Sequence, residues 1–188
     1  MKRIIVVLFV SLTSLVFVNA QQTVGGVTMP KKVMIGKTIL SLNGAGVREK
    51  YWINMYACGL YLNKKMTDEK LIINNDEHTA IKIQIISSLI TSKKMIEAVE
   101  EGFEKSTGGK TKPFRKRIDQ FKEVFSKEEI KQGDIYDIIY VPDKGTVIFK
   151  NGKLMPIIEG LDFKKALLGI WLGRDPADKE LKKGLLGN

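Results

Sequence analysis

Residues 113–158, PFRKRIDQFKEVFSKEEIKQGDIYDIIYVPDKGTVIFKNGKLMPII, decide the fold, because the spacing of their apolar residues changes partway along the segment. The first part carries four apolar side chains on one helical stripe: Phe114, Ile118, Phe121 and Phe125. This spacing predicts a helix from about Pro113 to Phe125. Strand-like runs separated by turn residues follow, and they predict a three-strand antiparallel meander. Its strands are Asp134–Val141, Thr146–Lys150 and Lys153–Ile158.

The two flanks of this segment continue the mixture of strands and helices. Upstream, Ala80–Ile85 alternates apolar and polar residues, which predicts a strand with one buried face. The helix expected after it has an apolar stripe of Met95, Val99 and Phe103. Downstream, Asp162–Leu172 is predicted to be a helix, and Asp175 to cap a last short one. Antiparallel strands with helices in blocks indicate an α+β fold, a large antiparallel sheet covered by a layer of helices.

Further strands are predicted before Ala80. Lys37–Leu42 is the first of them, and Asn43–Gly46 is predicted to be a turn because Asn and Gly tolerate positive φ. Arg48–Leu62, rich in Tyr, Trp, Ile and Leu, is then expected to form one long central strand. No repeat or linker interrupts the chain, so residues 21–188 are predicted to form a single domain.

The first twenty residues have the composition of a secretory signal peptide. Lys2 and Arg3 give a positive start, Ile4–Val18 is an apolar run, and the small residue Ala20 offers a cleavage site. The alternative is a membrane anchor, but the apolar run is short for a span and no basic cluster follows it at once. Residues 1–20 are therefore predicted to be removed, leaving an exported protein, periplasmic or secreted, without a stable membrane span.

The charge of the chain is strongly positive. Its 188 residues include 31 Lys and Arg against 21 Asp and Glu, a formal charge of +10. Removing Lys2 and Arg3 with the signal peptide leaves 29 basic residues and a charge of +8. A basic chain is a candidate for nucleic-acid binding, but export argues against that partner.

A single cysteine and a single histidine limit the chemistry. They exclude an intrachain disulfide and a structural Cys/His zinc site, and no metal site is expected. Cys58 lies in an apolar run and is predicted to be a small buried apolar residue. His78, the one candidate for a Ser-His or Cys-His pair, is expected at an exposed loop edge.

Arg48 is the main candidate for binding. An arginine beside aromatic residues on a sheet covered by helices can hold a carboxylate or phenolate within an apolar pocket. Tyr56 lies eight residues on, so in a regular strand both side chains share one face. Arg117 borders the apolar stripe of its helix and is the second candidate. The alternatives are a surface arginine at a strand end for Arg48 and an aliphatic stem covering apolar surface for Arg117.

Two stretches, LNGAGVR at 42–48 and YACGLYL at 56–62, resemble the chalcone isomerase family, in which a Gly-Ala-Gly-x-Arg turn leads into a strand ending in Gly-x-Tyr-Leu. The C-terminal IWLG at 170–173 and PAD at 176–178 are similar to its exported bacterial branch. The resemblance covers nearly all of residues 21–188. It implies an open-faced β-sandwich with a ligand cleft between sheet and helices, and no cofactor.

The resemblance also implies roles for particular residues. Arg48 corresponds to the arginine that points into the family's cleft, and Tyr56 to a cleft position that is Thr in the plant enzymes and Tyr in the fatty-acid binders. On the following helix, Phe114, Arg117 and Phe121 take the places of the enzymes' Tyr, Lys and Asn. Two of these three polar groups are therefore lost, and efficient flavonoid chemistry is not expected.

Three functions follow as hypotheses. The first is an exported binding protein for a small amphipathic anion, a fatty acid or an aromatic acid. Its binding residues would be Arg48, Tyr56, Phe114, Arg117, Ile118 and Phe121. The second is a cofactor-free isomerase, or intramolecular lyase, with Arg48, Tyr56 and Arg117 as catalytic residues. The third is an interaction protein whose basic surface meets anionic lipid or polysaccharide. The sequence makes no prediction of the oligomeric state.

Overall fold

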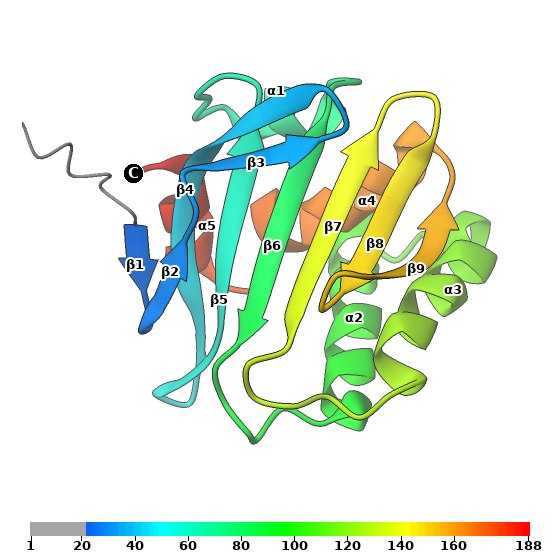
Figure 1. Ribbon diagram of the computed structural model, residues 1–188. Coiled ribbons are helices and arrows are strands. Elements are labelled where there is room, and N and C mark those ends of the chain that lie inside the picture. Colours follow the sequence, from blue (N-terminus) through cyan, green and yellow to red (C-terminus); the bar gives the residue numbers. More distant parts are fainter. Residues whose placement is uncertain (1–21) are drawn as a thin grey trace, which may run out of the picture.

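A seven-stranded antiparallel sheet forms the centre of the computed structural model, which describes residues 22–188 (Figure 1). The predicted signal peptide, residues 1–20, lies outside the described residues. Each strand pairs with the next along the chain, so the sheet is a meander. Its strands are β3 (Lys32–Ile35), β4 (Thr38–Lys50), β5 (Ile53–Leu62), β6 (Thr79–Ile85), β7 (Ile135–Val141), β8 (Gly145–Lys150) and β9 (Lys153–Ile158). The meander predicted from residues 134–158 is confirmed as β7–β9.

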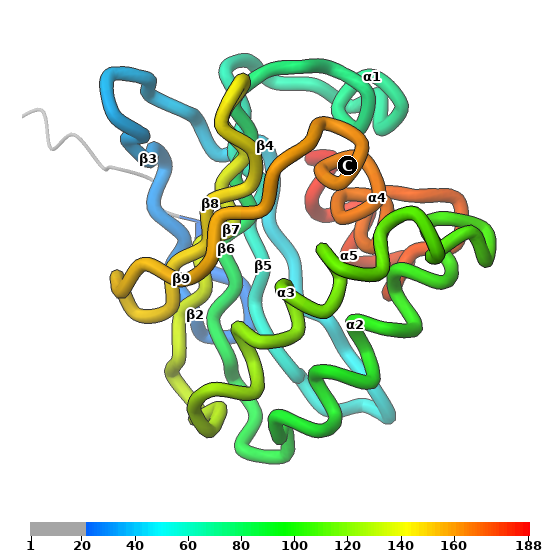
Figure 2. The backbone as a smooth tube through the Cα atoms, turned by 90° about the vertical axis from the view of Figure 1, so that its right-hand side faces the viewer, coloured from blue at the N-terminus to red at the C-terminus, as the bar shows by residue number. Residues whose placement is uncertain are grey.

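The helices cover one face of this sheet. They are α1 (Glu69–Asn74), α2 (Ser92–Thr107), α3 (Arg115–Ser126, after a short 3₁₀ turn), α4 (Leu161–Leu172) and α5 (Lys179–Leu186). Figure 2, turned so that the sheet is seen from its edge, shows α2, α3 and α4 on the same side of it. The main hydrophobic core lies between the two layers, and α4 is buried along most of its length. The α+β fold predicted from the sequence is confirmed.

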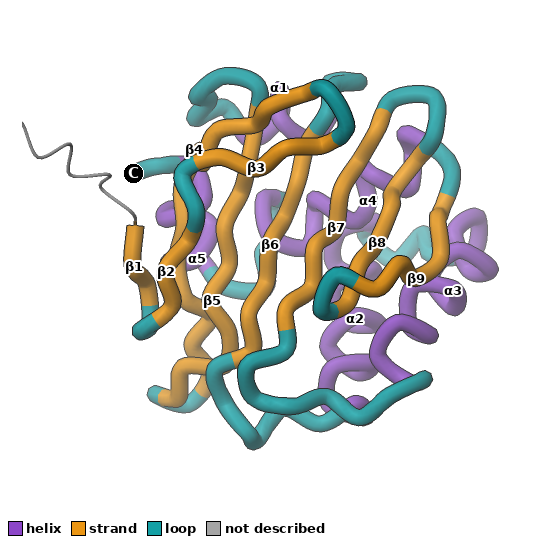
Figure 3. The backbone as a smooth tube through the Cα atoms, in the orientation of Figure 1, coloured by secondary structure: helices purple, strands orange, loops and turns teal. Residues whose placement is uncertain are grey.

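The opposite face of the sheet is only partly covered. A two-stranded ribbon, β1 (Gln22–Val24) and β2 (Val27–Met29), packs there over a second, smaller apolar cluster that includes Met29 and Tyr61 (Figure 3). Farther along this face, Lys82 and Asp137 lie opposite each other on β6 and β7 and form an ion pair of 2.6 Å. The arrangement is an open-faced sandwich.

The turn predicted at Asn43–Gly46 is wrong, because these residues continue β4 without reversing direction. Gly44 pairs with Leu60 of β5 and Gly46 with Cys58, and the register stays regular as far as Arg48. The predicted central strand Arg48–Leu62 is accordingly two strands, β4 and β5, joined by a tight turn.

The glycines of β4 serve close packing instead of a turn. Helix α5 lies directly on the strand, and a Cβ on Gly44 would overlap the carbonyl oxygen of Gly184 in that helix. A Cβ on Gly46 would lie 3.1 Å from the Leu181 side chain, and one on Gly184 would lie 2.7 Å from the Ala45 oxygen. Gly44, Gly46 and Gly184 therefore let backbone meet backbone. A turn and a close approach both favour glycine, so composition alone did not distinguish them.

The real turn of this hairpin has an unusual sequence. Tyr51 and Trp52 occupy its two central positions with φ of 53° and 61°. Both positive values mark the turn type that favours Asn-Gly, since a bulky residue there costs roughly 1–2 kcal/mol. The sequence held no turn residue at this point, and the hairpin was therefore missed.

The last helix is capped by Asp178 and not, as predicted, by Asp175. One carboxylate oxygen of Asp178 accepts from the Leu181 N–H at 2.9 Å, and the other accepts from the Glu49 N–H at 3.1 Å. A single side chain thus starts α5 and fixes it to β4 one residue beyond Arg48.

Replacement of Gly44 by alanine tests the close approach of α5. We expect Gly44→Ala to lower the free energy of unfolding by about 3 kcal/mol, because the added methyl group displaces the helix backbone. Gly36→Ala is the control, since Gly36 has positive φ but nothing within 4 Å of an added Cβ. That control is expected to cost only about 1 kcal/mol in denaturant unfolding. Equal losses for the two variants would contradict the packing account.

Candidate functional site

A cleft of about 360 Å³ opens between the β4–β5 hairpin and the start of α2. Its walls carry apolar side chains from both strands, from α2 and from the loop before α2. They are Tyr51, Ile53, Met55, Tyr56, Leu89, Ile90, Met95 and Ala98. Charged groups lie among them, namely Arg48, Lys50, Lys94, Glu97 and Glu101. An apolar cleft with a few convergent polar groups is the usual form of a small-molecule site.

Arg48 and Tyr56 lie side by side in this cleft. They are directly paired across β4 and β5, and the Arg48 guanidinium carbon is 5.7 Å from the centre of the Tyr56 ring. Both side chains therefore face the helices, as expected. The reason differs from the predicted one: the two residues are paired across the β4–β5 hairpin, whereas the sequence predicted them on a single strand, eight residues apart. On the same face of β4, Gly44 and Gly46 lie under α5, and Arg48 is the next residue along.

The Arg48 guanidinium has no carboxylate partner. Within residues 22–188 no Asp or Glu oxygen lies within 4.0 Å of it, whereas Arg115 pairs with Glu100 and Arg117 with Asp162. Glu101 of α2, which also lines the cleft, is instead bonded to Lys105 at 2.7 Å. A half-buried arginine at an apolar wall is thus left with its donors available.

Tyr56 offers a second donor at the same point. Its hydroxyl accepts a hydrogen bond of 3.0 Å from the indole N–H of Trp171, which leaves the phenol proton available. The residue is only 3% exposed, and burial raises its pKa even though the Arg48 charge acts in the opposite direction. The phenol is therefore neutral at physiological pH and can donate to an anion beside Arg48.

A smaller cavity of about 30 Å³ lies behind Arg48 and Tyr56. Its lining is almost wholly apolar and comes from α2, α3, α4 and the sheet, with Val99, Phe121 and Ile170 among the residues. This volume is about that of one water molecule in the liquid. Arg48 and Tyr56 thus stand at the inner end of the cleft, with the apolar core directly behind them.

The structure brings together three of the six residues singled out from the sequence: Arg48, Tyr56 and Phe121. Phe114, Arg117 and Ile118 do not line the cleft or the cavity behind it. The Arg117 guanidinium makes two bonds of 2.7 Å to Asp162 and one of 3.1 Å to the Glu159 carbonyl, with the Phe114 ring beside it. Arg117 therefore lies outside this cleft, and its partner is a carboxylate of α4, which the spacing of its own helix did not reveal.

Several cleft residues were not identified from the sequence. The sequence indicates Met95 only as part of a helical apolar stripe and Trp171 only as part of the C-terminal family motif, and the rim residues Leu89 and Lys94 carry no motif. One signal was present, because an indole in a buried helix needs a hydrogen-bond acceptor. Tyr56 is that acceptor, and only the packing of α4 on the sheet brings the two together.

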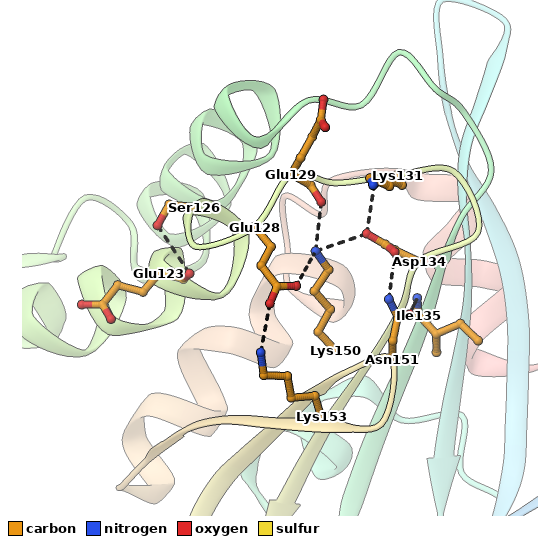
Figure 4. A network of polar contacts seen from close by, with 10 residues as sticks. All are labelled: Glu123, Ser126, Glu128, Glu129, Lys131, Asp134, Ile135, Lys150, Asn151 and Lys153. Carbon is orange, nitrogen blue, oxygen red and sulfur yellow. Dashed lines mark hydrogen bonds and ion pairs between the residues drawn. The ribbon is translucent and has the colours of Figure 1, made fainter.

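Two buried lysines elsewhere are satisfied by the fold. Figure 4 shows Lys150, 5% exposed, reaching the Glu129 carbonyl at 3.0 Å and the Asp134 carboxylate at 3.3 Å. These contacts attach the loop before β7 to the β8–β9 turn. Lys164, 1% exposed, donates to the carbonyls of Ile72 and Asn75 at the end of α1, and burial lowers its pKa to about 8. Neither lysine lines the cleft.

The remaining candidates for chemistry are structural. Cys58 is fully buried, as predicted, and burial raises the pKa of its thiol, which disfavours the reactive thiolate. Residues 22–188 hold no cluster of three His, Cys, Asp or Glu side chains suited to a metal ion. In the same range no helix combines the length and apolar character needed to cross a bilayer.

Comparison with known proteins agrees with this architecture. A crystal structure of a fatty-acid binding protein from Arabidopsis thaliana superposes with a TM-score of 0.68 at 18% identity, covering 86% of this chain and 92% of the other. No curated protein matches the sequence. The family model described as chalcone isomerase-like matches residues 21–187. The chain therefore belongs to the chalcone isomerase-like family.

Proposed function

We propose that this protein is an exported binder of a small amphipathic anion, a fatty acid or an aromatic acid, held in the cleft at the β4–β5 hairpin. The observation that carries the proposal is Arg48, a half-buried cation without a carboxylate partner in the described residues, beside an apolar wall. Export rests on the predicted signal peptide at residues 1–20.

The head group would be held by two kinds of donor. The Arg48 guanidinium can bind a carboxylate through two parallel N–H bonds, and the neutral Tyr56 hydroxyl can add a third from the strand beside it. A hydrogen bond to a charged group contributes about 1.5–3 kcal/mol. The Trp171 N–H holds the phenol oxygen, so the donor is already oriented before the ligand arrives.

The apolar part of the ligand would lie along the outer cleft. Met55, Ile90 and Met95 offer flexible or branched apolar surface there, suited to an alkyl chain or a ring. The volume of about 360 Å³ lies near the lower end of the roughly 300–1,000 Å³ found for small-molecule sites. This size supports a ligand with one chain or one or two rings, and the fatty-acid binding protein of the same fold supports the chain.

Replacement of Arg48 tests the proposal most directly. We expect Arg48→Ala to weaken binding of a fluorescent fatty acid by about 10–100-fold, because the charged contact is lost. The unfolding free energy is expected to change by less than about 1 kcal/mol, since the contact that the fold loses is the one between Arg48 and the Tyr56 ring. Arg117→Ala is the matched control and should retain full affinity, because Arg117 is bound to Asp162 outside the cleft. Equal affinities for wild type and Arg48→Ala would contradict the assignment.

The variant Tyr56→Phe removes the hydroxyl group and keeps the ring, so it measures the contribution of the hydroxyl alone. Loss of the donor is expected to weaken fatty-acid binding about 3–10-fold, and the unpaired Trp171 N–H to lower the unfolding free energy by about 1–3 kcal/mol. Because burial raises the pKa of Tyr56, wild-type affinity should stay level as the pH rises from about 7 to about 9. Isothermal titration at several pH values measures both effects, and affinity that falls with an apparent pKa below 9 would contradict a neutral donor.

A second candidate, the cofactor-free isomerase, is favoured by the same pair of residues. A cation and a neutral phenol donor beside one point in an apolar cleft can stabilise a developing enolate oxygen. Phe121, which stands where the resemblance places the enzymes' Asn, offers no polar group behind the cleft, and this argues against efficient turnover.

Absorbance decay of a hydroxychalcone decides between the two candidates. We expect the wild-type rate to match the uncatalysed rate at each pH, because Arg117, the group expected to position the phenolate, is bound to Asp162 outside the cleft. Arg48→Ala serves as the control for nonspecific acceleration by the protein surface. A wild-type rate that is clearly above background and is lost in Arg48→Ala would overturn the binding-only proposal in favour of the isomerase.

A further inference from the structure

Exposed aromatic and aliphatic side chains gather at the β4–β5 tip, next to the mouth of the cleft. Trp52 is 91% exposed and Tyr51 77%, and Ile53 and Leu89 are also among the exposed large apolar residues. Tyr51, Ile53 and Leu89 line the cleft, so the hairpin and the loop before α2 lie together. Figures 1 and 2 both show these two segments at the lower end of the molecule. We call Tyr51, Trp52, Ile53 and Leu89 the aromatic tip.

The backbone of the aromatic tip is strained by the residues that it carries. Tyr51 and Trp52 both have φ near +60°, in a two-residue turn where Asn-Gly would relax the chain. Their side chains are the two most exposed of the large apolar residues that the structure describes, so packing does not explain their presence. A turn that is unfavourable for the fold and apolar toward the solvent indicates a contact outside the chain.

Cations surround the aromatic tip. The Lys50 ammonium lies 5.6 Å from the centre of the Tyr51 ring, and Lys94 lines the same cleft next to Leu89. The cleft lining as a whole holds three cations, Arg48, Lys50 and Lys94, against two carboxylates, Glu97 and Glu101, and Glu101 is already bonded to Lys105. The whole chain has a formal charge of +10. The partner is therefore expected to be anionic as well as apolar.

We infer that the aromatic tip docks on the surface of an anionic lipid membrane. Trp and Tyr prefer the boundary between head groups and acyl chains, and lysines beside them attract anionic lipids. Insertion would bring the mouth of the cleft against the bilayer, where amphipathic anions are concentrated. Docking itself does not depend on the proposed ligand, since Trp52 and Lys50 would engage lipid whether or not the cleft is filled.

The test compares the protein's affinity for vesicles of phosphatidylcholine alone and with about a third phosphatidylglycerol. It uses residues 21–188, because residues 22–188 hold the whole described fold and the apolar segment before them would bind lipid by itself. Trp52 is the local reporter, since Trp171 is already buried at 5% exposure. We expect a blue shift of Trp52 emission with the anionic vesicles, weakened at high salt.

A double substitution, Tyr51→Asn with Trp52→Gly, removes the aromatic groups while relaxing the turn. We expect its affinity in vesicle co-sedimentation to fall at least about tenfold, while its Tm rises by a few degrees. Loss of binding in a more stable protein would exclude misfolding as the cause. Met34→Ser with Ile39→Ser is the control, because these residues are 75% and 57% exposed on the β3–β4 hairpin instead.

Arg48→Ala separates this inference from the proposed function, since it should lose the fatty acid and keep most of the vesicle affinity. Three results would overturn the inference. The first is that Trp52 emission does not shift when lipid is added. The second is that the double variant binds vesicles as tightly as the wild type. The third is that Trp52 emission shifts without lipid when the protein concentration is raised and a dimer forms. The last result would assign the aromatic tip to a second copy of the chain.

Discussion

The close approach of α5 to β4 is the constraint on which the rest of the site depends. Gly44 and Gly46 present no side chain to the helix, and Gly184 presents none to the strand, so two backbones lie in contact. Asp178 then fixes the first turn of the helix to the backbone of Glu49. The helix begins there, so the next side chain on that face, Arg48, is not covered by it. The cleft exists because α5 covers β4 only as far as Gly46 and leaves Arg48 open.

Ion pairing elsewhere makes Arg48 distinct. Arg115 and Arg117 satisfy Glu100 and Asp162, and the buried Lys150 and Lys164 satisfy loop and helix carbonyls. These contacts attach α3 to its neighbours, the loop before β7 to the sheet, and α4 to α1. Among the described residues, Arg48 alone of these five has no carboxylate or carbonyl partner, and its guanidinium lies beside Tyr56. The other four cations stabilise the fold, and Arg48 remains available to a ligand.

The sequence predicted those parts of the fold that depend on local period. The stripe from Phe114 to Phe125 and the alternation from Asp134 to Ile158 each encode an element by themselves. It failed where a residue has two physical uses or where the partner lies far away in the chain. Gly44 and Gly46 indicate a turn by composition, yet the turn of this hairpin is formed by Tyr51 and Trp52. The contact between Arg117 and Asp162 follows only from the packing of two helices. Family resemblance located Arg48 and Tyr56, while their pairing across the hairpin required the structure.

The turn at Tyr51 and Trp52 has a consequence for protein engineering. A design procedure that optimises folding stability alone would choose Asn-Gly at these two positions, since both residues have positive φ and both side chains are largely exposed. The first residues that such a redesign would discard are therefore the ones that face the surroundings most openly. A thermostabilised version of this chain should therefore keep its natural hairpin. At this turn the positive φ values favour Asn-Gly, whereas a contact outside the chain would need the exposed aromatic side chains.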